Sequence, residues 1–353
     1  MSGGVDSSVT AFLLKKQGYD VVGVFMRCYN LDGCAERDAE DARRVAEHIG
    51  IPFYAWDFEE EYKQRVVEYM IEGYRVGITP NPDVMCNREI KFGLFLEKAL
   101  ASGADFVATG HYVKIKNGAL FAARDNNKDQ SYFLWTLTQK QLAHCLFPIG
   151  NYEKLEVRKI AQRAGLPTAA KKDSQGICFL GDISIADFLK QSIPERRGAL
   201  VTTTGEKIGE HFGSEFYTIG QRHIDADFKF PKTGRTGVGT GVQRAAFYVA
   251  AKDATTNTVV VAEGSENEAL YKKEIEIANP NFINPKQKPA QGEELAVFAR
   301  VRYRQPLAPA KLSQLENGNY KLVFARPQKF VAQGQSAVWY SKTGEMLGGG
   351  VIV

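Results

Sequence analysis

Hydrophobic and polar positions follow one pattern in the first half of the chain and another in the second. In the first half, segments with helical spacing of apolar residues alternate with short apolar runs at 21–26, 53–58 and 104–109. Such runs are typical of parallel strands, which are buried between two layers of helices. The alternation therefore predicts an α/β domain built on a doubly wound parallel sheet.

The pattern changes after Tyr112. Two alternating segments flank Asn117-Gly118, which is a strong hairpin signal, and from about residue 196 short strand-like runs replace helical spacing. We expect an α/β domain at 1–195, a central β-rich domain at 196–268 and a small C-terminal β-barrel at 269–353. The Pro- and Asn-rich stretch 279–285 is expected near the seam between the two β domains.

Composition narrows the class of protein. The chain has 353 residues, 44% hydrophobic and 24% charged, which indicates a globular protein too long for a single core. No apolar run approaches the roughly 18 residues of a membrane span. Five irregularly spaced cysteines argue against a disulfide scaffold. Residues 1–190 carry 24 Lys+Arg and 25 Asp+Glu, whereas the remainder carries 21 Lys+Arg and 16 Asp+Glu. The positive excess of the C-terminal part favours a polyanionic partner only slightly.

The chain begins with a glycine-rich string, SGGVDSS at residues 2–8, directly before a helical pattern. Glycines let the backbone approach phosphate oxygens, hydroxyls add donors, and a helix N-terminus attracts anions; Ser7 is the predicted N-cap. An ordinary strand-to-helix turn is the alternative. A phosphate loop normally follows a buried strand, so about 8–12 apolar residues are expected before Met1 in the complete chain.

Two cysteines lie in strings that suggest reactive thiols. Cys86 ends NPDVMC, in a loop before a predicted helix whose N-terminus would lower the thiol pKa. Cys178 lies in the string DSQGICF at 173–179. For each cysteine alone, a buried and inert side chain is an equally good interpretation.

The string at 2–7 resembles the pyrophosphatase loop of enzymes that split ATP between its α and β phosphates. Together with NPDVMCN at 81–87, TGHY at 109–112, KDQS at 128–131, DSQGICF and RYRQ at 302–305, it is similar to the tRNA-uridine 2-sulfurtransferase family over the whole chain. The resemblance implies an enzyme that thiolates the wobble uridine in the anticodon stem-loop of tRNA and converts ATP to AMP and pyrophosphate.

The resemblance also implies a route. ATP adenylates the C2 oxygen of the uridine, and sulfur held as a persulfide on Cys178 attacks C2. Cys86 releases that sulfur by forming a disulfide with Cys178, because a second thiolate must resolve the persulfide. Asp83 would lie near the base and move a proton. A sulfur-relay protein or a cysteine desulfurase would supply the persulfide.

Binding residues follow from the same resemblance. ATP, with Mg²⁺ on its pyrophosphate, would contact Met1, Ser2, Gly3, Gly4, Val5, Asp6, Ser7, Met26 and Gly110, the last two at strand ends, where nucleotides bind in such sheets. tRNA would contact Asn81, Pro82, Asp83, His111, Lys128, Asp129, Gln130, Arg302, Tyr303 and Gln335, with the uridine out of its stack. Arg300, Arg302 and Arg304 alternate, so a strand would place all three on one face.

Alternatives stay open at this point. A synthetase could use the same ATP loop on another acceptor, although no glutaminase domain or N-terminal cysteine is present to supply ammonia, and an RNA-binding homologue could carry an inactive nucleotide site. An iron–sulfur cluster on Asp83, Cys86 and Cys178 would replace the thiol pair, although a C-x-x-C pair is lacking; no other metal site is expected. We expect a monomer in the bacterial cytoplasm, or alternatively in mitochondria, with no membrane partner.

Overall fold

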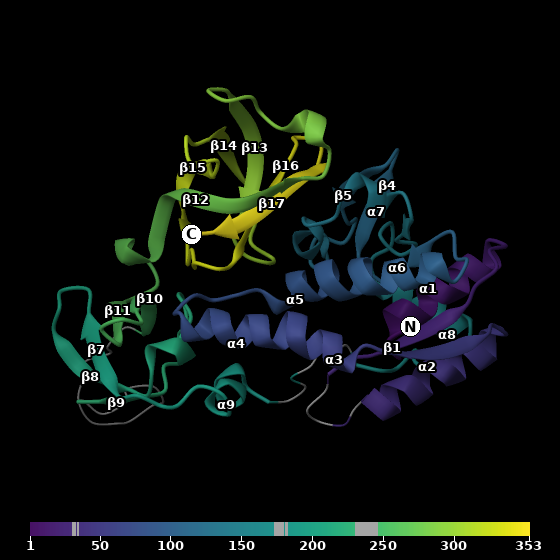
Figure 1. Ribbon diagram of the computed structural model, residues 1–353, viewed down its shortest axis with the longest axis horizontal. Helices are drawn as coiled ribbons and strands as arrows, with labels where there is room; N and C mark the ends of the chain where they lie inside the picture. Colours follow the sequence, from purple (N-terminus) through teal and green to yellow (C-terminus); the bar gives the residue numbers. More distant parts are fainter. Residues whose placement is uncertain (30–32, 34, 173–179, 181–182, 230–245) are drawn as a thin grey trace.

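The computed structural model describes residues 1–29, 33, 35–172, 180, 183–229 and 246–353. Figure 1 shows three bodies: an α/β domain on the right, a β-rich domain at the lower left and a barrel at the top. None of the helices in these described ranges is long and apolar enough to cross a bilayer. The expected domain limits at 195/196 and 268/269 stay a prediction.

Parallel strands form the centre of the first domain, as predicted. Strand β1 (Gly23–Arg27) pairs with β2 (Phe53–Asp57), and β3 (Val107–Ala108) pairs with β6 (Cys145–Leu146). The main-chain nitrogen of Met1 donates to the carbonyl of Val24 in β1. The α/β class is thus confirmed, although within the described ranges the parallel strands form two separate pairs rather than one sheet.

Helices cover these strands. Helix α2 (Ala35–Ile49) buries one apolar stripe, whereas α8 (Lys154–Arg163) packs against α1 (Val5–Lys16) through Val157 and Val9. Two longer helical stretches contain π-helical turns, which the sequence pattern did not predict. They comprise α3 (Glu59–Tyr62), η1 (Lys63–Val67) and α4 (Glu68–Arg75), and then α5 (Pro82–Met85), η2 (Cys86–Leu94) and α6 (Phe95–Ala101).

The predicted hairpin is confirmed. Strands β4 (Val113–Lys116) and β5 (Ala119–Ala122) are joined by Asn117 and Gly118, both with positive φ (52° and 74°), as the primed turns of two-residue hairpins require. The domain is completed by three short elements: η3 (Ser131–Leu134), α7 (Gln139–Leu142) and α9 (Ile185–Lys190).

The central domain is a five-stranded sheet with the order β10-β11-β7-β8-β9. Its strands are β7 (Gly198–Thr202), β8 (Lys207–His211), β9 (Ala226–Phe228), β10 (Phe247–Asp253) and β11 (Thr258–Glu263), with η4 (Ser214–Phe216) after β8. β11 and β7 run parallel, while the other neighbours are antiparallel. The core of this domain includes Leu200, Val249 and Val261, all fully buried.

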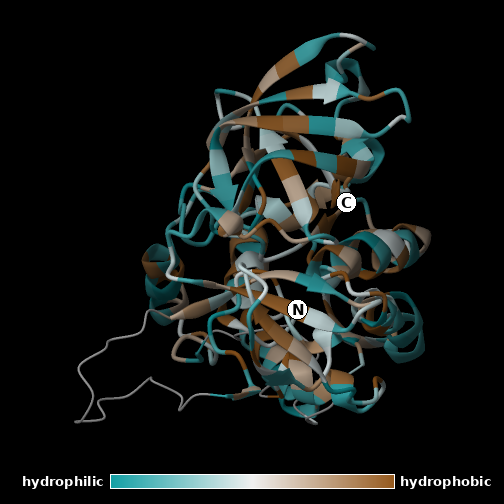
Figure 2. Cartoon of the chain, turned by 90° about the vertical axis from the view of Figure 1, so that its left-hand side faces the viewer, coloured by the Kyte–Doolittle hydropathy of each residue, from teal (hydrophilic) through white to brown (hydrophobic). Residues whose placement is uncertain are grey.

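The C-terminal domain is a closed six-stranded barrel with the order β12-β15-β14-β13-β16-β17. Its strands are β12 (Tyr271–Phe282), β13 (Glu294–Arg300), β14 (Ala308–Gln314), β15 (Tyr320–Lys329), β16 (Ser336–Tyr340) and β17 (Met346–Ile352). Figure 2 shows hydrophobic and hydrophilic residues alternating along several of these strands, because one face of each points into the barrel. The two predicted β domains are confirmed.

The expected place of the Pro- and Asn-rich stretch is wrong. Residues 279–281 of the Pro- and Asn-rich stretch do not lie at the seam, because they belong to the long strand β12. A register shift between Ala278 and Asn281 and a positive φ of 49° at Asn279 bend the strand there. Proline and asparagine thus mark a bulge in one strand rather than a linker.

The barrel is docked on the α/β domain through a mixed apolar and ionic contact. Val338 and Tyr340 of β16 share a buried cluster with Trp135, which follows η3. Beside this cluster, Arg300 at the end of β13 donates to Asp129 at 2.5 Å, and both side chains are buried. The barrel is therefore attached to the segment 128–130, which the sequence predicted to contact tRNA.

Candidate active site

The glycine-rich string forms a tight loop at the N-terminus of α1. Gly3 has a φ of +69°, and a Cβ there would lie 2.3 Å from the carbonyl oxygen of Asp38, so the position requires glycine. Gly4 is extended and is the N-cap of α1, and the hydroxyls of Ser7 and Ser8 donate back to its carbonyl at 3.1 and 2.8 Å. The predicted N-cap at Ser7 is therefore wrong, because the helix already begins at Val5.

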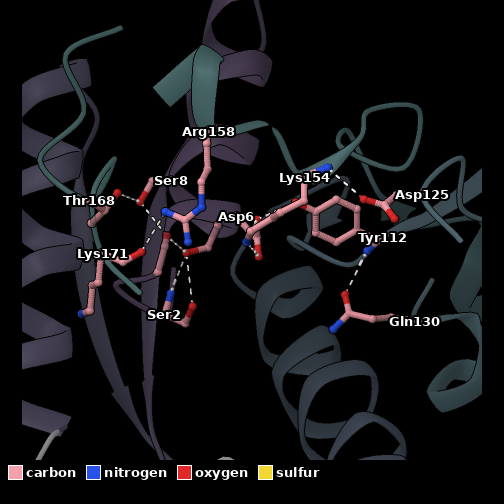
Figure 3. A network of polar contacts seen from close by, with 12 residues as sticks. Ser2, Asp6, Ser8, Tyr112, Asp125, Gln130, Lys154, Arg158, Thr168 and Lys171 are labelled. Atoms are coloured by element: carbon pink, nitrogen blue, oxygen red, sulfur yellow. Dashed lines mark hydrogen bonds and ion pairs between the residues drawn. The ribbon is translucent and has the colours of Figure 1, made fainter. Parts of the chain in front are cut away.

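A polar network holds Asp6, in the first turn of α1 (Figure 3). Lys154 Nζ donates to both carboxylate oxygens of Asp6 at 2.8 Å, and the Tyr112 hydroxyl donates to Oδ1, also at 2.8 Å. Gly110 approaches so closely that a Cβ there would lie 2.9 Å from the main chain of Asp6 and Ser7. The segment 110–112 is therefore packed directly against the phosphate loop.

The loop that carries Lys128, Asp129 and Gln130 is anchored to the same network. Asp125 accepts from the main-chain nitrogen of Lys154 at 3.0 Å, and Gln130 Oε1 accepts from the main-chain nitrogen of Tyr112 at 3.0 Å. Gln130 in turn donates its own main-chain N–H to the Tyr112 carbonyl. Both residues that hold Asp6 thus also hold this loop.

The second part of the candidate site is the helical segment that begins after Asn81. The Asn81 side chain accepts from the main-chain nitrogen of Val84 at 3.2 Å, and Pro82 occupies the first helical position, where no N–H is needed. Asp83 lies in the first turn, and Cys86 begins the π-helical stretch η2. Because a π-helix bonds each residue to the fifth one along, Lys91 lies about one turn beyond Cys86.

The electrostatics at Cys86 differ from the expectation. Burial raises the pKa of its thiol above the ordinary value, and the nearby Asp83 adds to the rise, while Lys91 and a hydrogen bond with Tyr62 oppose it. The expected lowering of the thiol pKa by a helix N-terminus is wrong, because α5 continues into η2 and Cys86 is only 5% exposed. Desolvation also raises the pKa of Asp83, and Lys91 again opposes it.

The partner thiol proposed from sequence, Cys178, lies outside the described residues, as does the rest of 173–179. The residues just before this segment are held by hydrogen bonds and ion pairs. Arg158 donates to the carbonyls of Ala169 and Lys171, and the Lys171 ammonium contacts Asp38 and Asp41 of α2 at 2.7 and 2.5 Å. Lys171 therefore lies beside α2, the helix that packs on the phosphate loop.

Two residues of the barrel domain lie against the helix that carries Asp83 and Cys86. Gln335 Nε2 donates to the carbonyls of Thr79 and Pro80 at 3.0 and 3.1 Å, directly before Asn81. Tyr303 packs on Phe133 with ring centroids 4.6 Å apart, and the Phe133 carbonyl accepts from Asn87 at 3.4 Å. Gln335 and Tyr303 are thus brought to the helix that carries Asp83 and Cys86.

Three other predicted tRNA residues are engaged inside the protein. Asp129 is 4% exposed and accepts from Ala123, Ser131 and Arg300. His111 is 7% exposed, and its Nδ1 forms a hydrogen bond with the hydroxyl of Thr109. Burial and the charge of Lys91 hold the pKa of His111 well below its ordinary value. Arg302 donates to the Ile219 carbonyl and lies over the Phe330 ring at 5.6 Å.

The expected arginine face is wrong. β13 ends at Arg300, whose guanidinium is buried, and the chain then turns, with a φ of +64° at Arg304. The three arginines therefore do not share the face of a strand.

Met26 lies near the end of β1 and packs at the edge of the apolar cluster that contains Cys86. The residue predicted to contact the nucleotide and the thiol of Cys86 therefore border the same cluster.

Sequence reasoning missed Lys154, Lys91 and the hydroxyl of Tyr112. Tyr112 lay in a noted string, but nothing in the local pattern marked either lysine. Lys154 and Asp6 are 148 residues apart, so their pairing arises only from the packing of α8 on α1.

Three family models match the chain in succession. The model described as the tRNA methyl transferase HUP domain matches residues 1–182, that of the tRNA methyl transferase PRC-barrel domain matches 186–263, and that of the aminomethyltransferase beta-barrel domain matches 272–352. The order of the matches is that of the α/β domain, the central sheet and the barrel.

Curated relatives match over the full chain. A protein of Enterococcus faecalis named tRNA-specific 2-thiouridylase MnmA is 47% identical, and the alignment covers 100% of this chain and 93% of the relative. Proteins with the same name from Lysinibacillus sphaericus and Streptococcus pyogenes are 44% and 46% identical; their alignments cover 100% of this chain and 92% and 93% of the relatives.

Proposed function

The chain belongs to the tRNA-specific 2-thiouridylase family, and we propose that it replaces the C2 oxygen of the tRNA wobble uridine by sulfur through an adenylated uridine and a cysteine persulfide. In the first step the C2 oxygen attacks the α phosphorus of the MgATP substrate, and pyrophosphate leaves. The loop 2–7 would hold the pyrophosphate through main-chain N–H groups and hydroxyls at the start of α1. Met26 and Gly110 would flank the rest of the nucleotide.

The second step transfers sulfur. The outer sulfur of a Cys178 persulfide attacks C2, and the Cys86 thiolate attacks the inner sulfur. The S–S bond of the persulfide breaks, a Cys86–Cys178 disulfide forms, and AMP leaves with the former C2 oxygen. The two cysteines supply the two electrons that reduce the transferred sulfur, so a thiol reductant must then open the disulfide. Asp83, whose pKa is raised by desolvation, is suited to exchange a proton near the base.

One observation carries the proposal most strongly: the barrel residue Gln335 bonds the two carbonyls directly before Asn81. The predicted RNA-contacting barrel thus adjoins the helix that carries Asp83 and Cys86. A uridine that is splayed out of its stack would reach one place where a proton carrier and a thiol both lie. A separate sulfur-relay protein or a cysteine desulfurase would load Cys178.

The proposal is tested with unmodified tRNA, ATP, Mg²⁺, a cysteine desulfurase with cysteine as the persulfide source and a thiol reductant, followed by digestion to nucleosides. The wild type should form 2-thiouridine and AMP in equal amounts, and both Cys86→Ser and Cys178→Ser should form no 2-thiouridine. Cys145→Ala is the matched control, because Cys145 is a buried thiol that bonds the Gln141 carbonyl and lies in a different apolar cluster. Thiolation that survives in Cys178→Ser would overturn the role given to that residue.

A further inference from the structure

Two routes of direct contact lead from the loop 125–130 to Asp6 in the phosphate loop. The first route runs through Tyr112. Gln130 is bonded to the main chain of Tyr112 in both directions, at 3.0 Å each, and the Tyr112 hydroxyl donates to Asp6 Oδ1 at 2.8 Å. Tyr112 is 1% exposed, so its ring has no room to turn while the loop stays in place.

The second route runs through Lys154, the first residue of α8. Its main-chain nitrogen donates to Asp125 Oδ2 at 3.0 Å, and its ammonium donates to both oxygens of Asp6 at 2.8 Å. Asp125 also accepts from the main-chain nitrogens of Asn127 and Lys128, at 3.0 and 3.2 Å. A shift of the Lys128 main chain therefore moves Asp125, and Asp125 in turn moves Lys154, whose ammonium neutralises Asp6.

The two routes meet at one carboxylate that lies in the first turn of α1. Figure 3 shows Gln130, Tyr112, Lys154 and Asp125 on one side of Asp6 and the Ser8–Thr168 contact on the other. The close approach of Gly110 to the main chain of Asp6 and Ser7 leaves no slack between the segment 110–112 and the phosphate loop. A displacement at residues 128–130 is therefore transmitted to the loop rather than absorbed.

From this convergence we infer that Tyr112 and Lys154 are positioning residues that couple tRNA contact at 128–130 to the geometry of the phosphate loop, so that bound tRNA tightens the binding of ATP. The inference rests on the proposed function, because it requires tRNA as the substrate, with Lys128, Asp129 and Gln130 as the contacts that the family resemblance implies. By linkage the effect is reciprocal, and ATP must tighten tRNA binding by the same factor.

The experiment measures this coupling factor as a ratio of affinities. The affinity for α,β-methylene-ATP, which cannot be cleaved between its α and β phosphates, is measured by calorimetry with and without saturating unmodified tRNA. The wild type should bind the analogue about 5–10-fold more tightly with tRNA present, in the range of ordinary allosteric couplings. Tyr112→Phe, which keeps the ring and removes only the hydroxyl, should reduce this factor by at least half.

A second variant and a control complete the design. Lys154→Met should also lower the coupling factor, and the double variant should bring it to about one. Tyr19→Phe removes the hydroxyl of an exposed tyrosine in the same domain and should leave the factor unchanged. Simple destabilisation would weaken both affinities together and leave their ratio as it was, so the ratio separates coupling from folding.

The outcomes are distinct. A wild-type factor of one, or a wild-type factor retained in the double variant, would overturn the inference while 2-thiouridine formation still supported the proposed function. A wild type that forms no 2-thiouridine and binds neither tRNA nor the analogue would overturn both.

Discussion

Arg300 of the barrel donates to Asp129 of the α/β domain at 2.5 Å, and its guanidinium also contacts the hydroxyls of Ser131 and Tyr340. Neither Arg300 nor Asp129 is more than 5% exposed. This buried ion pair is one of the polar contacts that join the barrel to the α/β domain.

Breaking this pair should loosen the barrel. Asp129→Ala leaves the Arg300 charge buried without its partner, which typically costs about 3–5 kcal/mol. The thermal midpoint should fall, and tRNA affinity should fall with it, whereas ATP analogue affinity without tRNA should change less. The exposed pair of Lys311 and Glu294 provides the control, because Lys311→Ala should not move the midpoint measurably. An unchanged midpoint in Asp129→Ala would contradict the assigned role of the pair.

Lys154→Met should raise the KM for ATP while kcat changes less. Without its ammonium, the Asp6 carboxylate faces the triphosphate with its full negative charge, and a repulsion of about 1.4 kcal/mol corresponds to a factor of ten in affinity. Lys154→Arg should recover most of the loss. Lys159→Met, at an exposed position on the same helix, is the matched control, and steady-state kinetics at saturating tRNA supply the measurement.

Alkylation of Cys86 should be slow at neutral pH and should accelerate well into the alkaline range. Burial raises the pKa of this thiol, so its reactive thiolate is scarcer at pH 7–8 than in a free cysteine. Lys91 opposes the rise, and Lys91→Gln should therefore slow alkylation by iodoacetamide at pH 8 about three- to tenfold, up to one pKa unit. The rate is read from the Cys86 peptide by mass spectrometry.

Arg88 supplies the matched control for that measurement, because it is an exposed cation on the same helix. Arg88→Gln should alter the Cys86 rate much less than Lys91→Gln. Equal effects of the two substitutions would mean that Lys91 acts only as part of the general surface charge.

Acid should destabilise the protein partly through His111. Burial holds the pKa of His111 well below its ordinary value, so below about pH 6.5 the unfolded chain binds a proton that the folded protein does not. Stability is therefore present above that pH and is lost as the pH falls towards the folded-state pKa. His111→Gln should flatten the decline of the thermal midpoint between pH 7 and pH 5, whereas the exposed His48→Gln should leave it as steep as in the wild type.

Local sequence signals predicted much of the fold. Asn117-Gly118 specified a hairpin because these two residue types readily adopt the positive φ angles that a two-residue turn requires. The change from helical spacing to short alternating runs marked the two β domains. The π-helical turns at 63–67 and 86–94 had no such signal in the pattern of apolar residues.

The chemistry of the site was less accessible from the sequence. The helix start near Cys86 was recognised, but its effect on the thiol was given the wrong direction, because the burying residues come from other elements, such as Tyr62. Lys154 could not be found at all, since its role depends on Asp6, which lies 148 residues earlier. Motifs identify residues that act locally, whereas positioning residues become visible only when distant segments have packed.

The contact between Gln335 and residues 79–80 spans 256 positions of the chain. Protein synthesis proceeds from the N-terminus, so Asn81, Asp83 and Cys86 leave the ribosome long before the strand that supports them exists. The first domain can acquire most of its secondary structure early, yet the helix that carries Asp83 and Cys86 obtains its final support only when β16 has been made and the barrel has closed. A nascent or C-terminally cut chain should therefore be unable to perform the reaction, even though every residue that takes part in the chemistry is already present.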